Sequence, residues 1–150
     1  MILEINNPVN RITDINEYLK CFNLTQPATF TIYVDQPIPN ENDTWAGNPM
    51  DPDVGHTFIA IKQGGIRRII GFYPSLPVDL NAPSSPGSFE NDSAHVYDVA
   101  MSININTAQL VKLIAYIKLK ASSTYNLNSF NCTDFGMNAS TIVGMPLGSA

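Results

Sequence analysis

Alternating and near-continuous runs of apolar residues in the middle of the chain predict a β-hairpin. Residues 55–62 and 66–73 are rich in β-branched and aromatic side chains, as strands are. Between them, Gly64-Gly65 supplies the positive φ angles that a tight two-residue turn needs. In that register residue 63 faces residue 66, and His56 lies opposite Tyr73.

Two further strands are expected on either side of this hairpin. In Ala28–Asp35, apolar residues alternate with threonine and tyrosine, which predicts a half-buried strand. Residues 94–105 form the second strand. Between the strands, residues 40–53 and 75–93 are rich in Pro, Ser, Gly, Asn and Asp, and both are predicted to be loops.

Helical periodicity is present at both ends of the chain. Residues 13–22 place apolar side chains at helical spacing and predict a short helix. Thr107–Lys120 is expected to be a longer one, preceded by a capping box formed by Asn106 and Gln109. A last helix should begin at Cys132 or Thr133, with Asp134 in its first turn, where a carboxylate favours the positive end of the helix dipole.

The order helix, strand, hairpin, strand, helix, helix predicts an α+β fold with an antiparallel sheet. No repeat or linker divides the 150 residues, so residues 1–150 are expected to form a single domain. The following side chains are predicted to share one core: Phe30, Ile32, Phe58, Ile69, Leu110, Leu113, Ile114, Ile117 and Phe135.

Composition limits the partners. The net charge is −5, which argues against nucleic acid, because proteins that bind it neutralise phosphates with Lys and Arg. No apolar run has the length of a membrane span. The first residues lack the basic and apolar regions of a signal peptide, so a cytoplasmic protein is expected. Export by a route that needs no signal peptide, as for some toxins, is an alternative expectation. Asn131-Cys132-Thr133 matches the glycosylation triplet, and a glycan there would sit against a catalytic Cys132, which favours a bacterial or phage cytosol.

The scarce cysteines and histidines carry the candidate chemistry. Cys21 and Cys132 are too few for a disulfide framework, and the spacing of two Cys and two His does not suit zinc, so neither a metal nor a cofactor is expected. Cys21 reads as a core thiol. Trp45 either pins its loop to the core or lines a substrate cleft.

Cys132 and His56 form a candidate catalytic pair. A thiol at a helix N-terminus beside an imidazole is activated as a nucleophile, and the two residues need only meet in space. The imidazole could take the proton of the thiol and return it to a leaving group. A third polar group should orient the imidazole, and Asp98, His95 and Tyr73 are the candidates. Asp98 ranks first, because a carboxylate both orients an imidazolium and stabilises it. A purely structural interpretation stays open, in which His95 is a surface residue and Asp134 only caps a helix.

Two segments resemble a known superfamily. Gly55-His56-Thr57-Phe58-Ile59, followed by Tyr125-x-Leu127-x-x-Phe130-Asn131-Cys132-Thr133-x-Phe135, is similar to the circularly permuted papain-like proteins, which include the NlpC/P60 and lecithin-retinol-acyltransferase groups. The resemblance covers about residues 29–145. It implies a papain-like α+β fold with the histidine strand before the cysteine helix, Cys132 as nucleophile and His56 as base. The family usually places a third polar residue on the strand after the histidine strand, where this chain has Ile69, Ile70, Gly71 and Phe72.

Two functions follow as hypotheses. The first is a thiol-dependent hydrolase of the cysteine peptidase or amidase type, which cleaves an amide or ester of a peptide-like or acyl substrate through an acyl-enzyme. The second is a non-catalytic module on the same fold that binds a protein partner, and the missing third position of the family motivates it.

Overall fold

The computed structural model describes residues 10–35, 46–48, 51–53 and 55–145. The described helices are α1 (Ile15–Leu19), α2 (Thr107–Lys120) and α3 (Cys132–Ile142). The described strands are β1 (Arg11–Ile12), β2 (Ala28–Asp35), β3 (Ala46–Asn48), β4 (Asp51–Asp53), β5 (His56–Gln63), β6 (Ile66–Pro74), β7 (Ser84–Glu90), β8 (Val99–Ile105) and β9 (Thr124–Asn126).

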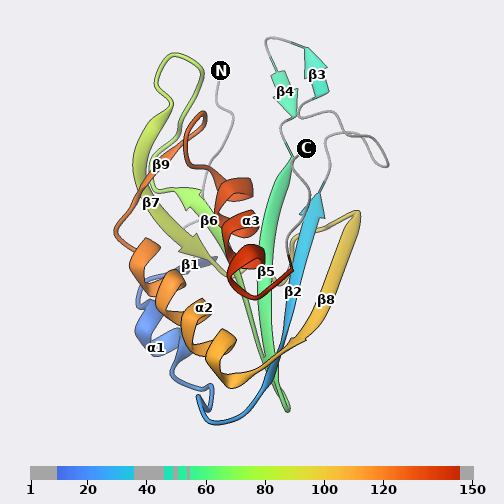
Figure 1. The fold of residues 1–150 in the computed structure, drawn as a ribbon. Helices are drawn as coiled ribbons and strands as arrows, with labels where there is room; N and C mark the ends of the chain where they lie inside the picture. Colours follow the sequence, from blue (N-terminus) through green and yellow to red (C-terminus); the bar gives the residue numbers. More distant parts are fainter. Residues whose placement is uncertain (1–9, 36–45, 49–50, 54, 146–150) are drawn as a thin grey trace.

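Seven of the described strands form one antiparallel sheet, with helices packed against it (Figure 1). The strand order is β1-β7-β6-β5-β2-β8, and β9 pairs with β7. The short strands β3 and β4 pair with each other. The predicted α+β class with an antiparallel sheet is therefore confirmed.

The hairpin of β5 and β6 has the predicted register. Gln63 pairs with Ile66 and Phe58 with Gly71, so His56 and Tyr73 lie opposite each other just beyond the last of these pairs. Gly64 takes a positive φ of 59°, but Gly65 does not. A positive φ at the first central residue alone fits a type II′ turn, which matches the twist of the flanking strands.

The helices begin where the sequence places their caps. The Asn106 side chain accepts the Gln109 N–H at 2.8 Å, and the Gln109 side chain accepts the Asn106 N–H in return. The first helix is shorter than the predicted 13–22. Asp14 is its N-cap, and its side chain accepts the Glu17 N–H, so the helix starts at Ile15.

The predicted core residues are all buried, but they occupy two clusters rather than one. Ile59 and Ile61 of β5 join the main cluster beneath the three helices. Phe58 and Ala60 point to the opposite face and form a second cluster with Tyr33 and Ile69. Successive strand residues face opposite sides of a sheet, so one strand contributes to both cores.

Two loop predictions were wrong. Residues 75–93 contain β7, and residues 40–53 contain β3 and β4. In β7 the composition is that of a loop, with Phe89 its one large apolar residue. The strand is held by pairing with β6, β1 and β9, which are distant in sequence and invisible to a local pattern.

The strand expected over residues 94–105 starts later, at Val99. A turn precedes it, in which the His95 N–H donates to the Asp92 carbonyl at 2.9 Å. Among the described residues, no helix has the length and apolar character needed to cross a membrane.

Candidate active site

The start of α3 presents Cys132. The helix begins at this residue, as predicted, and Asn131 is the N-cap. The Asn131 side chain accepts the N–H groups of Thr133 and Asp134 at 3.0 and 3.1 Å, and Asp134 Oδ2 accepts the Asn131 N–H. This capping box confirms the predicted position of Asp134 in the first turn. Cys132 therefore stands at the positive end of the helix dipole, with 6% of its surface exposed.

The start of β5 presents His56. It is the first residue of the strand, follows Gly55 with its φ of 72°, and is 5% exposed. Helix α3 packs closely on this end of β5. The hydroxyls of Thr57 and Thr133 lie 3.2 Å apart, and a Cβ added to Gly136 would lie 2.6 Å from Thr57 Cγ2. The glycine thus lets the helix approach the strand closely enough to bring the two starts together.

The structure brings Cys132 and His56 together. Burial lowers the pKa of the His56 imidazole, but the charge of Cys132 and the hydrogen bond to Asp92 raise it, and the net pKa lies well above the ordinary value of 6.5. His56 Nε2 lies 2.8 Å from Asp92 Oδ2. Nδ1 is buried and makes no well-formed hydrogen bond to the described residues. Because Asp92 occupies Nε2, Nδ1 is the ring nitrogen available to the thiol.

Asp92 is the residue that sequence reasoning missed. It follows β7 and reaches His56 over β6, at Gly71. A Cβ on Gly71 would overlap Asp92 Oδ2 and lie 2.8 Å from its Cγ. The available signal was the glycine itself, which stands alone among the large residues of Ile69-Ile70-Gly71-Phe72-Tyr73. An isolated glycine inside a strand often marks the close approach of another group.

The three candidates for the orienting group have different positions. Asp98 is exposed, and its N–H donates to the Val34 carbonyl at 2.9 Å, so its backbone joins β2, the neighbour of β5. The carboxylate at His56 is that of Asp92 instead. The turn after Asp92 ends the extended chain early, and this displaces Asp98 from the position expected for it in an uninterrupted strand.

His95 and Tyr73 both contact the His56 ring. Their ring centroids lie 4.7 and 4.6 Å from that of His56. His95 is half-buried rather than a surface residue, and its Nδ1 lies 2.7 Å from the Val96 carbonyl. The Tyr73 hydroxyl donates to Asp92 Oδ1 at 2.8 Å. Tyr73 therefore bonds to Asp92, and the group at His56 Nε2 is the Asp92 carboxylate.

The remaining sequence candidates are Cys21 and Trp45. Cys21 is half-buried against the main core, where its thiol donates to the Tyr18 carbonyl at 3.7 Å. Trp45 lies outside the described residues. Among the described residues, no group of three or more His, Cys, Asp or Glu side chains is placed to hold a metal ion.

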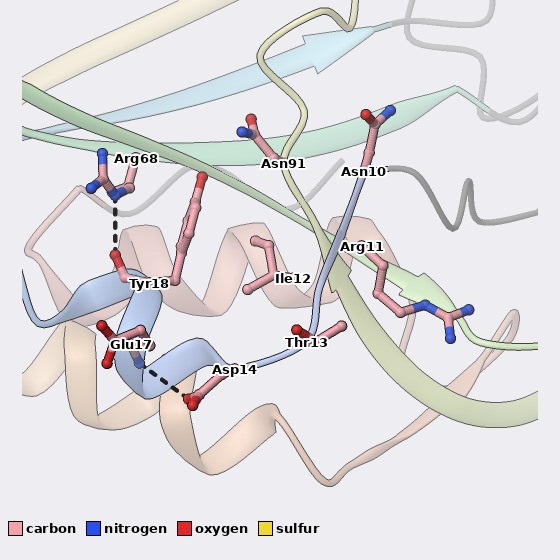
Figure 2. A pocket seen from close by; sticks show the side chains of 9 residues that line it. All are labelled: Asn10, Arg11, Ile12, Thr13, Asp14, Glu17, Tyr18, Arg68 and Asn91. Atoms are coloured by element: carbon pink, nitrogen blue, oxygen red, sulfur yellow. Dashed lines mark hydrogen bonds between the residues drawn. The ribbon is translucent and has the colours of Figure 1, made fainter.

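The structure also has a pocket of about 530 Å³, whose lining residues are drawn in Figure 2. It is lined by β1, α1 and neighbouring residues, among them Arg68, whose Nε donates to the Tyr18 carbonyl at 3.1 Å. Neither Cys132 nor His56 lines it. Its link to the candidate site is Asn91, the residue before Asp92, so the pocket lies beside the segment that presents the carboxylate.

Comparison of the chain with protein-family models, with curated proteins and with solved structures finds no match. The geometry of the site therefore carries the functional argument.

The raised pKa of His56 predicts how stability depends on pH. The folded protein holds the imidazole proton more tightly than the unfolded chain does. This contribution is fully present below the unfolded pKa of about 6.5 and is lost as pH rises through the higher folded pKa. We expect the unfolding free energy of the wild type, minus that of His56→Gln, to be largest near pH 6 and to fall in alkaline solution. Denaturant titrations at several pH values measure it, and a difference that grows with pH would contradict the assignment.

Proposed function

We propose that this protein is a thiol-dependent hydrolase of the cysteine peptidase or amidase type, which cleaves an amide or ester through an acyl-enzyme on Cys132. The observation that carries the proposal is one buried network. A helix-leading cysteine, a strand-leading histidine and a carboxylate meet although they come from three distant parts of the chain. Burying three titratable groups together lowers the stability of the folded protein, so stability does not explain their presence. Titratable groups with perturbed pKa values of this kind cluster at functional sites.

The fold supports a circularly permuted papain-like architecture as part of the same proposal. The strand that presents His56 precedes the helix that presents Cys132, and that helix packs on the antiparallel sheet through Gly136. In the resembling family the third polar residue lies on the strand after the histidine strand. Here that strand is β6, with Gly71 where Asp92 crosses it. The carboxylate of the next segment thus occupies the space that a β6 side chain would fill.

The proposed reaction begins with attack by the Cys132 thiolate. Its sulfur forms a bond to the carbonyl carbon of the substrate, and the carbonyl π electrons move to the oxygen. The tetrahedral intermediate collapses, the bond to the leaving amine or alcohol breaks, and the His56 imidazolium supplies the proton. A water molecule then attacks the thioester carbonyl while His56 takes a proton from that water. The C–S bond breaks, which regenerates the Cys132 thiolate and releases the carboxylic acid.

Asp92 would hold the imidazole in place and stabilise its charged form. The Cys132 N–H would donate to the oxyanion. The Asn131 side chain caps the N–H groups of Thr133 and Asp134 and leaves that of Cys132 for this purpose. A peptide-like or acyl substrate fits a chain with net charge −5 better than a polyanion does.

Alkylation with iodoacetamide near neutral pH tests the proposal without a known substrate. Cys132 should react about a hundredfold faster than Cys21, because a thiol at a helix N-terminus beside an imidazole is activated. The His56→Gln variant should lose most of that advantage, and peptide mass spectrometry after timed labelling assigns the rate to each thiol.

Equal and slow labelling of both thiols in the wild type would refute the hydrolase. A protein-binding module on the same fold would then be the better interpretation. Cys21 in the same molecule serves as the internal control for unfolding, since an unfolded chain exposes both thiols.

A further inference from the structure

We propose that Tyr73 is a positioning residue, whose hydroxyl holds the Asp92 carboxylate in the orientation that fixes the tautomer of His56. This inference rests on the proposed function and assigns the site a fourth member, one that does not touch the reacting atoms.

The Asp92 carboxylate is bonded at both oxygens. Oδ1 accepts the Tyr73 hydroxyl at 2.8 Å, and Oδ2 lies 2.8 Å from His56 Nε2. Tyr73 is 6% exposed and Asp92 5%, so both bonds lie away from water. A hydrogen bond to a charged acceptor in such surroundings is stronger than one in solvent.

The path of Asp92 over β6 explains why a second bond is needed. Gly71 offers the carboxylate space but no side chain to pack against its near side. With the bond to His56 alone, the carboxylate could turn about its terminal torsion, which is broad. The Tyr73 hydroxyl removes that freedom, and the Tyr73 ring also packs on the His56 ring with centroids 4.6 Å apart.

A fixed carboxylate selects one tautomer of the neutral imidazole. An ionised carboxylate only accepts hydrogen bonds, so the proton must be on Nε2. Nδ1 is then the basic nitrogen, and it is the one available to Cys132. Tyr73 thus acts on the thiol through two intermediaries, Asp92 and His56.

The His56 imidazole can report this role directly. The titratable groups that face it are Cys132 from α3, Asp92 and His95 from the segment between β7 and β8, and Tyr73 from β6. The chain has two histidines, so two imidazole ¹⁵N patterns are expected, and a His95→Gln variant assigns them.

The test is Tyr73→Phe, with Tyr97→Phe as the matched control. Both variants remove a phenol hydroxyl, but Tyr97 makes ring contacts to Tyr33 and Phe58 and has no described bond to Asp92. In Tyr73→Phe we expect mixed Nε2–H and Nδ1–H tautomers, a lower pKa for His56, and alkylation of Cys132 slowed about tenfold. Tyr97→Phe should match the wild type in all three.

The electronic alternative predicts the opposite sign. If the carboxylate stays in place without its phenol donor, it carries more charge toward Nε2, and the pKa of His56 rises. A raised or unchanged His56 pKa with a single tautomer in Tyr73→Phe overturns the positioning role, whatever the labelling rates are.

Failure of the hydrolase proposal is a separate result. Slow labelling of Cys132 in the wild type refutes the nucleophile and leaves the ¹⁵N spectra unaffected. Fast wild-type labelling with no change in Tyr73→Phe spectra or rates refutes Tyr73 alone.

Discussion

Cys132→Ser should abolish acyl-enzyme formation and leave the fold intact. p-Nitrophenyl acetate is a suitable probe, since it transfers its acetyl group to an activated thiol and releases a coloured phenol. We expect the rate of acetylation, followed by intact-mass spectrometry and by the released phenol, to fall by roughly two orders of magnitude or more. A serine hydroxyl beside the same imidazole is far less ionised than a thiol.

The matched control for this change is Cys21→Ser. Cys21 is half-buried and bonds only weakly to the Tyr18 carbonyl, so its replacement should leave the acetylation rate of Cys132 near that of the wild type. Acetylation of Cys132→Ser at another residue, as fast as in the wild type, would remove Cys132 from the mechanism.

Gly71→Ala should disrupt the site from a position that carries no chemistry. The new methyl group would overlap Asp92 Oδ2 and lie 2.9 Å from Tyr73 Cε2. The carboxylate must therefore leave His56. We expect alkylation and acetylation of Cys132 to slow by about tenfold or more, as after loss of a charged hydrogen bond, and the unfolding free energy to fall by about 1–3 kcal/mol through overpacking.

Gly65→Ala provides the control on the same hairpin. Its added Cβ meets nothing within 4 Å and its φ is not positive, so site and stability should change little. A second comparison separates the two carboxylates. Asp92→Asn should slow the reaction, whereas Asp98→Asn should not. If Gly71→Ala labels and unfolds like the wild type, the path of Asp92 over β6 is misassigned.

Local patterns in the sequence determine the hairpin of β5 and β6, strand β2, helix α2 and the start of α3. Each of these elements is marked by a turn, a cap or a hydrophobic pattern that lies within a short stretch of sequence. The Gly64-Gly65 turn sets the register, Asn106 and Gln109 cap α2, and Asn131 and Asp134 cap α3. Such turns and caps depend on backbone geometry within a few residues, so a sequence can reveal them.

The tertiary structure alone decided how the sheet is completed and which carboxylate reaches His56. Strand β7 carries Ser84-Ser85-Pro86-Gly87-Ser88, a composition typical of loops, and it exists because β6, β1 and β9 pair with it. Phe58 and Ile59 likewise belong to different core clusters, on opposite faces of the sheet, because the helices cover only one of those faces.

Scarcity and position let the sequence select Cys132 and His56, since few residues compete for their roles and each stands at the start of an element. The same reasoning ranked Asp98 first because a carboxylate both orients an imidazolium and stabilises it, and it expected Asp98 on an uninterrupted strand over residues 94–105. Asp92 reaches His56 through the long-range pairing of β7 with β6 and through the space left by the missing side chain at Gly71; the local turn from Asp92 to His95 follows it. The sequence thus predicted the starts of β5 and α3, where His56 and Cys132 lie, because caps and turns are local. The fold decided which carboxylate lies beside them, because strand pairing joins residues that share no local pattern.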